Sequence, residues 1–316
     1  MSTTSTLEFS NLPTDTIGKI IEKCDLKEQL TLRKVSKDLR SLVDKQKIAY
    51  KSIEIYLTES YILCAYNGKN VVYAGKNCDE KNAFGFDYKG CFIRSDDHEK
   101  IALNDVSIAL NNPKLRLDVL TVSYYSNDRM RLFRLNSLLQ HLNHQIHVKT
   151  LIFHTGSSEY LLSTLRYLKP KALVNIEIDG VYDGDYSALE KVRQVASLNQ
   201  WKQAEQLTAR FSFHYFPSEF LMHFKRFVIL DWDVDEVFLV NLRGLFSTST
   251  NFESCTVETL GLEDCSDYLE SFCEKVDTGD ADVLLYHYKI PDDSNQMLEF
   301  KLDYDQQKII ILKENL

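Results

Sequence analysis

The chain of 316 residues is poor in glycine and proline, with 11 glycines and 5 prolines. It has no glycine-rich phosphate loop, no Gly-x-Ser-x-Gly nucleophile turn and no His-Glu-x-x-His metal motif. These motifs supply the backbone donors, nucleophiles and metal ligands of many enzymes. We therefore expect a protein that is not an enzyme and needs no cofactor.

Cysteine is sparse too, with seven residues and no Cys-x-x-Cys pair. An odd, scattered set without zinc-ligand spacing predicts reduced thiols that pack as small hydrophobes. No run approaches the roughly 20 apolar residues of a membrane span, and Met1 to Thr6 lacks the basic and apolar segments of a signal peptide. We expect a protein of the cytoplasm or nucleus that does not contact a membrane.

Positive charge is scarce near the end of the chain. Residues 255–316 hold 5 Lys and Arg against 15 Asp and Glu, whereas the whole chain has a net charge of -9. Nucleic-acid binding relies on clustered Lys and Arg, so direct nucleic-acid binding is not expected. A solvated acidic surface is the simplest interpretation of this segment.

The first 45 residues predict three short helices. Pro13 suits the first turn of a helix over about residues 13–24, because its missing N–H would have no partner there. Asp25 and Glu28 have the spacing of a capping box, which starts a second helix near Leu26. Ser36 can cap a third helix. Three helices of this size are too small to form a core unaided, so another surface must cover their apolar face.

These residues resemble an F-box, the three-helix module that binds the Skp-type adaptor of cullin–RING ubiquitin ligases. The resemblance rests on Leu12-Pro13, Ile17/Ile20/Ile21, Asp25-Leu26, Leu30-x-Leu32-Arg33-x-Val35-Ser36 and Leu39-Arg40. The adaptor-facing residues that it implies are Leu12, Pro13, Ile17, Ile20, Leu26, Leu30, Leu32, Val35 and Leu39. Many F-boxes carry a Trp near the Arg40 position, which this chain lacks. The alternative is a helical cap on the rest of the protein.

The next region alternates with period two. Tyr61–Tyr66 and Asn70–Ala74 flank Asn67-Gly68, a pair typical of a type I′ hairpin turn. A second hairpin is predicted from Phe84–Tyr88 and Cys91–Arg94. A helix over about 99–110 then ends before Pro113.

Beyond Pro113 the pattern apolar-x-x-apolar-x-apolar recurs with helical segments between the copies. The six copies are Leu117/Leu120/Val122, Val148/Leu151/Phe153, Leu173/Ile176/Ile178, Ala204/Leu207/Ala209, Phe224/Phe227/Ile229 and Val257/Leu260/Leu262. Such a repeat predicts an α/β fold in which an irregular leucine-rich-repeat-like solenoid follows the small all-α module. The alternative architecture is a doubly wound α/β sheet.

This region resembles the FTH domain, which follows the F-box in a large family of nematode proteins. The resemblance rests on Lys149–Phe153, Leu173–Ile178, Gln200–Ala204 and Phe224–Phe227. It implies a scaffold that binds a substrate or partner. Met297–Leu302 and Lys308–Leu312 predict a hairpin at the end of the solenoid. We divide the chain into residues 1–48 (F-box), 49–112 (a hairpin-rich connection or first part of the scaffold) and 113–316 (FTH-like scaffold).

The residues between the paired apolar positions should lie on the open face of the strands. They are Thr121 and Ser123, Ile152 and His154, Glu177 and Asp179, Thr208 and Arg210, and Val228 and Leu230. Because solenoids recognise partners on such faces, the residues expected to bind a substrate are Thr121, His154, Glu177, Asp179, Thr208 and Arg210. Unpaired charge is not tolerated in a core, so Glu177, Asp179 and Arg210 should be accessible.

Three further groups suggest sites only weakly. His141, His144 and His147 share a helical spacing that places the third ligand poorly for a metal, and exposed histidines are the simpler interpretation. Asp179, Asp183 and Asp185 lack the later glutamate of a calcium loop. The aromatic run from Phe211 to Phe224 fits core packing better than a binding stripe.

The sequence therefore predicts a substrate receptor of a cullin–RING ligase. Its partners would be a Skp-type adaptor, a cullin bound through that adaptor, and an unidentified protein substrate. Two alternatives remain open: a small-molecule enzyme on a doubly wound sheet, and an F-box scaffold with no role in degradation.

Overall fold

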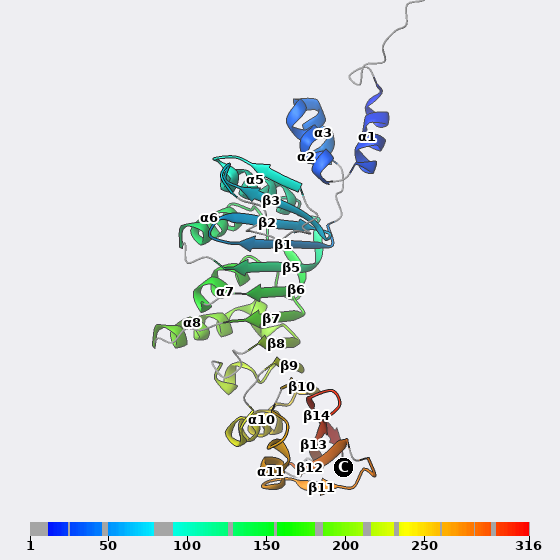
Figure 1. Cartoon of the computed structure of the whole chain (residues 1–316), viewed down its shortest axis with the longest axis vertical. Helices are drawn as coiled ribbons and strands as arrows, with labels where there is room; N and C mark the ends of the chain where they lie inside the picture. Colours follow the sequence, from blue (N-terminus) through cyan, green and yellow to red (C-terminus); the bar gives the residue numbers. More distant parts are fainter. Residues whose placement is uncertain are drawn as a thin grey trace, which may run out of the picture.

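The computed structural model describes residues 12–24, 26–45, 50–78, 91–125, 129–154, 157–180, 186–210, 216–230, 234–259, 261–280, 282–291 and 295–315. Three helices precede one long sheet, and further helices run along one side of its stacked strands (Figure 1).

The helices are α1 (Thr14–Lys23), α2 (Leu26–Val35), α3 (Lys37–Lys45), α5 (His98–Leu110), α6 (Arg129–Gln140), α7 (Ser158–Leu165), α8 (Tyr186–Ser197), α9 (Asn199–Lys202), α10 (Glu236–Thr248) and α11 (Cys265–Glu270), with a 3₁₀ turn η3 (Ser218–Phe220). The strands are β1 (Ser52–Leu57), β2 (Tyr61–Tyr66), β3 (Lys69–Ala74), β4 (Cys91–Arg94), β5 (Arg116–Tyr124), β6 (His147–His154), β7 (Asn175–Asp179), β8 (Gln206–Arg210), β9 (Arg226–Leu230), β10 (Ser254–Glu258), β11 (Glu274–Val276), β12 (Val283–Lys289), β13 (Gln296–Asp303) and β14 (Lys308–Asn315).

The helices α1, α2 and α3 form the N-terminal module at the predicted positions. Ser36 accepts a hydrogen bond from the N–H of Leu39 at 3.1 Å, which confirms it as the cap of α3. The Gln29 side chain donates to the carbonyls of Ile21 and Cys24, both at 2.9 Å, and so satisfies carbonyls at the end of α1. Asp25 of the expected capping box lies outside the described residues.

The N-terminal module has a small hydrophobic core of its own. Ile17, Ile21, Leu39 and Val43 are buried in a cluster separate from that of the sheet. The expectation that three short helices form no core is therefore wrong, because α1 and α3 pack against each other. The cluster is nevertheless small beside that of the sheet.

The strands form a single 14-stranded sheet in the order β11-β12-β13-β14-β10-β9-β8-β7-β6-β5-β1-β2-β3-β4. From β5 to β10 each strand pairs in parallel with the next one along the chain, and β1 pairs in parallel with β5. In a doubly wound sheet, the order in which successive strands are added reverses partway across the sheet. From β5 to β10, by contrast, each new strand is added on the same side of the previous one. This part of the sheet is therefore singly wound.

A repeated backbone feature explains the apolar-x-x-apolar-x-apolar pattern. At the start of β8, the N–H groups of Glu205 and Gln206 both donate to the carbonyl of Val174, at 2.8 and 3.1 Å. Two residues then face one residue of the neighbouring strand, which is the arrangement of a β-bulge. The same double donation occurs from Asp118/Val119 to Lys51, from Lys225/Arg226 to Glu205 and from Glu253/Ser254 to Lys225. The extra residue lets apolar side chains on both sides of the bulge point towards the helices.

This feature corrects the sixth copy of the pattern. The sequence pattern assigns the sixth copy to Val257/Leu260/Leu262. In the structure, β10 buries Cys255 and Val257, and the buried Phe252 comes just before the bulge at Glu253 and Ser254. The copy is therefore Phe252/Cys255/Val257. Cys255 is fully buried and occupies a position that the other copies fill with aliphatic or aromatic residues, as expected of a small hydrophobe.

The two ends of the sheet contain antiparallel pairs. The predicted β2–β3 hairpin is confirmed, and Asn67 and Gly68 have φ angles of 50° and 75°, as a type I′ turn requires. The β13–β14 hairpin is confirmed as well, and it is extended by β12 and β11, which were not predicted. Cys91–Arg94 forms β4, which pairs in parallel with β3, while the expected partner segment Phe84–Tyr88 lies outside the described residues.

Candidate functional site

The first candidate surface is the apolar exterior of the N-terminal module. Among the predicted adaptor-facing residues, Pro13, Ile20 and Val35 are exposed, and Val35 keeps 67% of its surface accessible. Exposed aliphatic side chains on two helices of one small module offer area for a partner.

Other predicted adaptor-facing residues lie deeper. Ile17 and Leu39 belong to the core of the module, and Leu12 and Leu32 are partly buried against that core. Ile17 and Leu39 therefore support the shape of the module from within. The side chains of Leu26 and Leu30 lie outside the described part of the chain.

Arg40 occupies the position near which many F-boxes carry a Trp. Its Nε donates to the carbonyl of Arg33 at 3.3 Å, close to the end of α2. Cationic side chains stabilise the carbonyl end of a helix. Arg40 is exposed, so it joins α3 to α2 without filling a core position.

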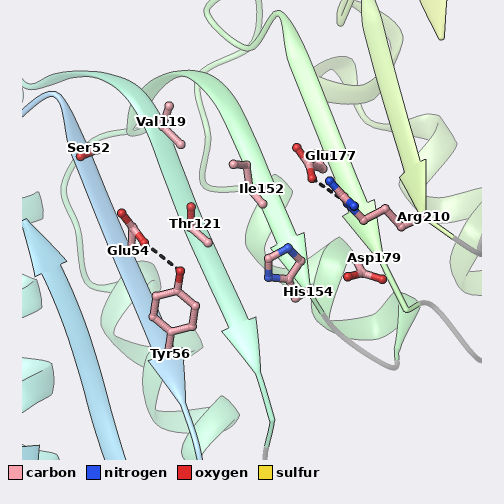
Figure 2. A pocket seen from close by; sticks show the side chains of 10 residues that line it. All are labelled: Ser52, Glu54, Tyr56, Val119, Thr121, Ile152, His154, Glu177, Asp179 and Arg210. Atoms are coloured by element: carbon pink, nitrogen blue, oxygen red, sulfur yellow. Dashed lines mark hydrogen bonds and ion pairs between the residues drawn. The ribbon is translucent and has the colours of Figure 1, made fainter. Parts of the chain in front are cut away.

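The second candidate surface is a hollow of about 500 Å³ on the open face of the sheet. Figure 2 shows its side chains projecting from four adjacent strands, β1, β5, β6 and β7, and from β8 beside them. The lining residues are Ser52, Glu54, Tyr56, Val119, Thr121, Ile152, His154, Glu177, Asp179 and Arg210.

The pairing of the strands arranges these residues in rows across the sheet. One row runs Glu54, Thr121, Ile152, Glu177 and Thr208, because each residue is the register partner of the next. A second row runs Tyr56, Ser123, His154, Asp179 and Arg210. Neighbouring residues in a row are separated by one strand spacing, about 4.8 Å. The positions of the residues on the open face at the hollow are therefore set by the strand spacing and the register of the backbone.

Hydrogen bonds hold several of these side chains in place. Arg210 Nε donates to Glu177 Oε1 at 3.1 Å (Figure 2). The Tyr56 hydroxyl donates to Glu54 Oε2 at 2.8 Å. Burial, and then this bond to the carboxylate, raise the pKa of Tyr56, so its hydroxyl stays protonated and remains the donor.

His154 is held by Ser123, its register partner on the neighbouring strand β5. Its Nδ1 lies 2.9 Å from the hydroxyl oxygen of Ser123, which is fully buried. A ring held in this way has one nitrogen left for a ligand, and which nitrogen carries the proton depends on the tautomer.

The hollow carries more negative than positive charge. Glu54, Glu177 and Asp179 contribute three carboxylates and Arg210 one cation, which gives -2 with His154 neutral. Asp179 makes no ion pair with any residue that the structure describes. A surface with this charge attracts cationic groups.

The open-face placement from sequence is confirmed for Thr121, His154, Glu177, Asp179, Thr208 and Arg210. Five of them line the hollow, whereas Thr208 lies beside it on β8. The side chains of Glu177 and Arg210 are 22% and 40% exposed, so the expected accessibility holds for this pair. Their role in binding a substrate stays a prediction.

Sequence reasoning missed the contribution of β1. Ser52, Glu54 and Tyr56 alternate with buried Ile53, Ile55 and Leu57, which is a clear strand signal. The pairing of β1 with β5 joins residues more than 60 positions apart and leaves no local signal.

The weaker candidates gain no support. Among the residues that the structure describes, no group of three His, Cys, Asp or Glu could hold a metal ion. Asp183 and Asp185 lie outside the described residues, as do Phe211 to Tyr215. Phe216 and Phe224 are buried, as expected of core aromatics. In the same part of the chain, each helix is too short or too polar to span a membrane.

Comparisons with known proteins match two parts of the chain. Residues 9–51 match the F-box domain and residues 132–273 match the FTH domain. The F-box A protein 224 of Caenorhabditis elegans is 22% identical over 300 residues, which cover 90% of this chain and 74% of the relative.

The FTH match begins within α6 and ends just before β11, so it contains β6 to β10. One side of the hollow, from Ile152 to Arg210, lies inside the FTH match, while the β1 and β5 side precedes it. The F-box match thus covers the described helices of the N-terminal module, and the FTH match covers β6 to β10 of the singly wound part of the sheet. The chain combines a match to the F-box domain with a match to the FTH domain, in the order of the nematode F-box and FTH family that its sequence resembles.

Proposed function

We propose that this protein is the substrate-receptor subunit of a cullin–RING ubiquitin ligase. The observation that carries the proposal is the F-box match over a helical module that exposes Pro13, Ile20 and Val35. F-box domains typically bind a Skp-type adaptor and, through it, a cullin. Burial of these aliphatic side chains would supply the hydrophobic part of that contact.

The rest of the chain serves, in this proposal, as a scaffold for a protein substrate. The repeated bulges and the sequential parallel strands support a leucine-rich-repeat-like solenoid. Residues 49–112 belong to this scaffold as its first part, because β1 pairs with β5 and completes the hollow. The residues proposed to contact the substrate are Thr121, His154, Glu177, Asp179, Thr208 and Arg210.

A receptor of this kind contributes position rather than chemistry. Holding a substrate near the ubiquitin-charged enzyme raises the effective concentration of its lysines. This requires a rigid surface that binds, and the ligase transfers ubiquitin elsewhere in the complex. The cytoplasm or nucleus is the proposed location.

Co-purification with a Skp-type adaptor tests the proposal. Ile20→Asp with Val35→Asp places charge on two exposed positions, so folding should persist while adaptor binding falls at least about tenfold. The control is Lys19→Asp with Lys37→Asp, which changes charge on α1 and at the start of α3, just after α2, without replacing an apolar side chain.

Retention of the adaptor by the Ile20 and Val35 double variant would contradict this docking face. No recovery of the adaptor by the wild-type chain would contradict the proposed function. Once the complex is obtained, ubiquitination of captured proteins in a reconstituted reaction separates a degradation receptor from a scaffold.

A further inference from the structure

The charge and the spacing of the side chains in the hollow indicate which kind of ligand it can bind. We propose that it binds an extended segment of a protein substrate that carries two basic residues four positions apart, with an apolar residue midway between them. This inference rests on the proposed role of the open face in holding a substrate. It adds the class of segment that the face recognises.

The distance between two carboxylates sets the spacing. Glu54 on β1 and Asp179 on β7 are three strands apart, roughly 14 Å across the sheet, and one row apart, about 7 Å along the strands, so the two positions are separated by roughly 16 Å and the reach of a long basic side chain covers the difference from the peptide spacing. An extended peptide advances about 3.3 Å per residue, so positions i and i+4 are about 13 Å apart and point to the same side. A basic side chain at each position would reach one carboxylate.

The two carboxylates differ from Glu177 in their availability. Glu177 is paired with Arg210 at 3.1 Å, whereas Asp179 makes no ion pair with a described residue, and Glu54 is bonded to the neutral hydroxyl of Tyr56. Asp179 and Glu54 therefore keep negative charge for an incoming cation. Arg210 would repel a third basic residue placed beside Asp179. The segment should therefore carry no further basic residue on that side.

The floor between the carboxylates suits the middle of the segment. Ile152 lies in the same row as Glu54 and offers an apolar surface for the residue at i+2. Beside it, Thr121 is only 4% exposed and lines the hollow, and its hydroxyl makes no hydrogen bond to another described residue. The hydroxyl is therefore available to accept from a peptide N–H or donate to a peptide carbonyl above it.

The test uses fluorescence polarisation with the full chain, alone and in complex with its adaptor. The probe is a fluorescein-labelled peptide, Gly-Ser-Arg-Ser-Leu-Ser-Arg-Ser-Gly. A peptide with both arginines replaced by glutamate and one with adjacent arginines are the matched probes. We expect the first peptide to bind best, and its affinity to fall as salt rises from about 0.05 M to about 0.5 M.

The protein variants assign the binding to the hollow. Glu54→Gln with Asp179→Asn removes the two carboxylates of the hollow that make no ion pair with a described residue, with little change in shape, and should weaken binding at least about tenfold. Thr121→Val should weaken it by a smaller factor. The control Glu258→Gln with Glu263→Gln removes the same charge from β10 and the segment after it, outside the hollow, and should leave affinity unchanged.

Four results would overturn the inference: no binding of the dibasic peptide, equal binding of the glutamate peptide, equal binding of the adjacent-arginine peptide, or unchanged affinity in the Glu54 and Asp179 variant with a wild-type circular dichroism spectrum. Spermidine binding that is tighter than peptide binding would also overturn it, in favour of a free polyamine. Adaptor binding is read separately, so its failure would count against the proposed function and not against this inference.

Discussion

Arg210 on β8 and Glu177 on β7 form an ion pair across adjacent strands, with Nε and Oε1 separated by 3.1 Å. The pair lies on the open face, and the two side chains keep 40% and 22% of their surface accessible. An ion pair in this setting contributes little to folding, because water screens it. Its main effect is to neutralise one of the three carboxylates of the hollow.

Replacing Arg210 should therefore change binding more than stability. Arg210→Gln is expected to alter the free energy of unfolding by no more than about 1 kcal/mol. It should at the same time tighten binding of the dibasic peptide, because the net charge of the hollow changes from -2 to -3. Denaturant unfolding and peptide titration measure the two effects. Weaker peptide binding by this variant would contradict the electrostatic effect assigned to Arg210 and would show that its contact with the ligand is attractive.

The N-terminal module should be the least protected part of the isolated chain. Among its described side chains the core contains four buried residues, whereas the cluster of the sheet includes residues from β1 to β14. We expect amides of residues 14–45 to exchange faster than those of β5 to β10, and to slow at least about tenfold when the adaptor binds. Hydrogen–deuterium exchange with mass spectrometry measures both. Equal exchange with and without adaptor would favour the module as a helical cap on the chain.

Trp201 should be among the most stabilising residues of the scaffold. It is fully buried, stacks on Phe216 at 5.1 Å, meets Phe224 edge-on at 5.2 Å, and donates its Nε1–H to the carbonyl of Phe220 at 2.9 Å. Trp201→Ala is expected to lower the free energy of unfolding by about 3–5 kcal/mol. Chemical denaturation measures the loss. Phe133→Ala is the control, since Phe133 is 65% exposed and its removal should have little effect.

His223 should make the scaffold sensitive to mild acid. Burial lowers its pKa and Lys202 adds to this, against the opposing effect of its hydrogen bond to the Trp201 carbonyl at 2.8 Å. Because its pKa is lower in the folded state than the roughly 6.5 of an unfolded histidine, the unfolded chain takes up the proton first. Stability is therefore complete above about pH 6.5 and falls as the pH drops towards the folded-state pKa.

A variant isolates this effect. His223→Gln keeps a donor for the Trp201 carbonyl but does not titrate. Between about pH 7.5 and pH 5.5, the melting temperature should fall less for this variant than for the wild type. Parallel melting curves for the two proteins over that range would show that other groups cause the acid sensitivity.

The local parts of the fold could be predicted from sequence because local chemistry determines them. Asn67-Gly68 alone specified the β2–β3 turn, since both residues adopt positive φ readily. The recurring apolar spacing located β5 to β9, and at the starts of β5, β8 and β9 a bulge imposes that spacing on the strand. Only the sixth copy was misplaced, where Cys255 filled an apolar position.

Long-range pairing could not be predicted in the same way. β1 has a clear alternating pattern, yet nothing in Ser52–Leu57 specifies β5 as its partner instead of a second hairpin strand. The candidate site was consequently half predicted: Glu177, Asp179 and Arg210 follow from the repeat, while Glu54 and Tyr56 enter only through that pairing. On the F-box, the pattern identified apolar residues but did not separate inward-facing Ile17 from exposed Ile20.

The repeated bulge also affects how this protein can evolve. In several repeats, two successive N–H groups at the start of a strand donate to one carbonyl of the neighbouring strand. These hydrogen bonds use only backbone groups, so any strand that begins in this way can pair with the strand before it. A duplicated strand and helix inserted after β7 would therefore restore the backbone hydrogen bonds on both of its sides. The same insertion would increase the separation between Glu177 and Arg210 by one strand spacing, about 4.8 Å, so the residues of the inserted strand would decide whether each charge finds a partner. Insertion of one strand and helix can thus change the side chains that the open face presents to a partner, while the backbone pairing of the sheet is preserved.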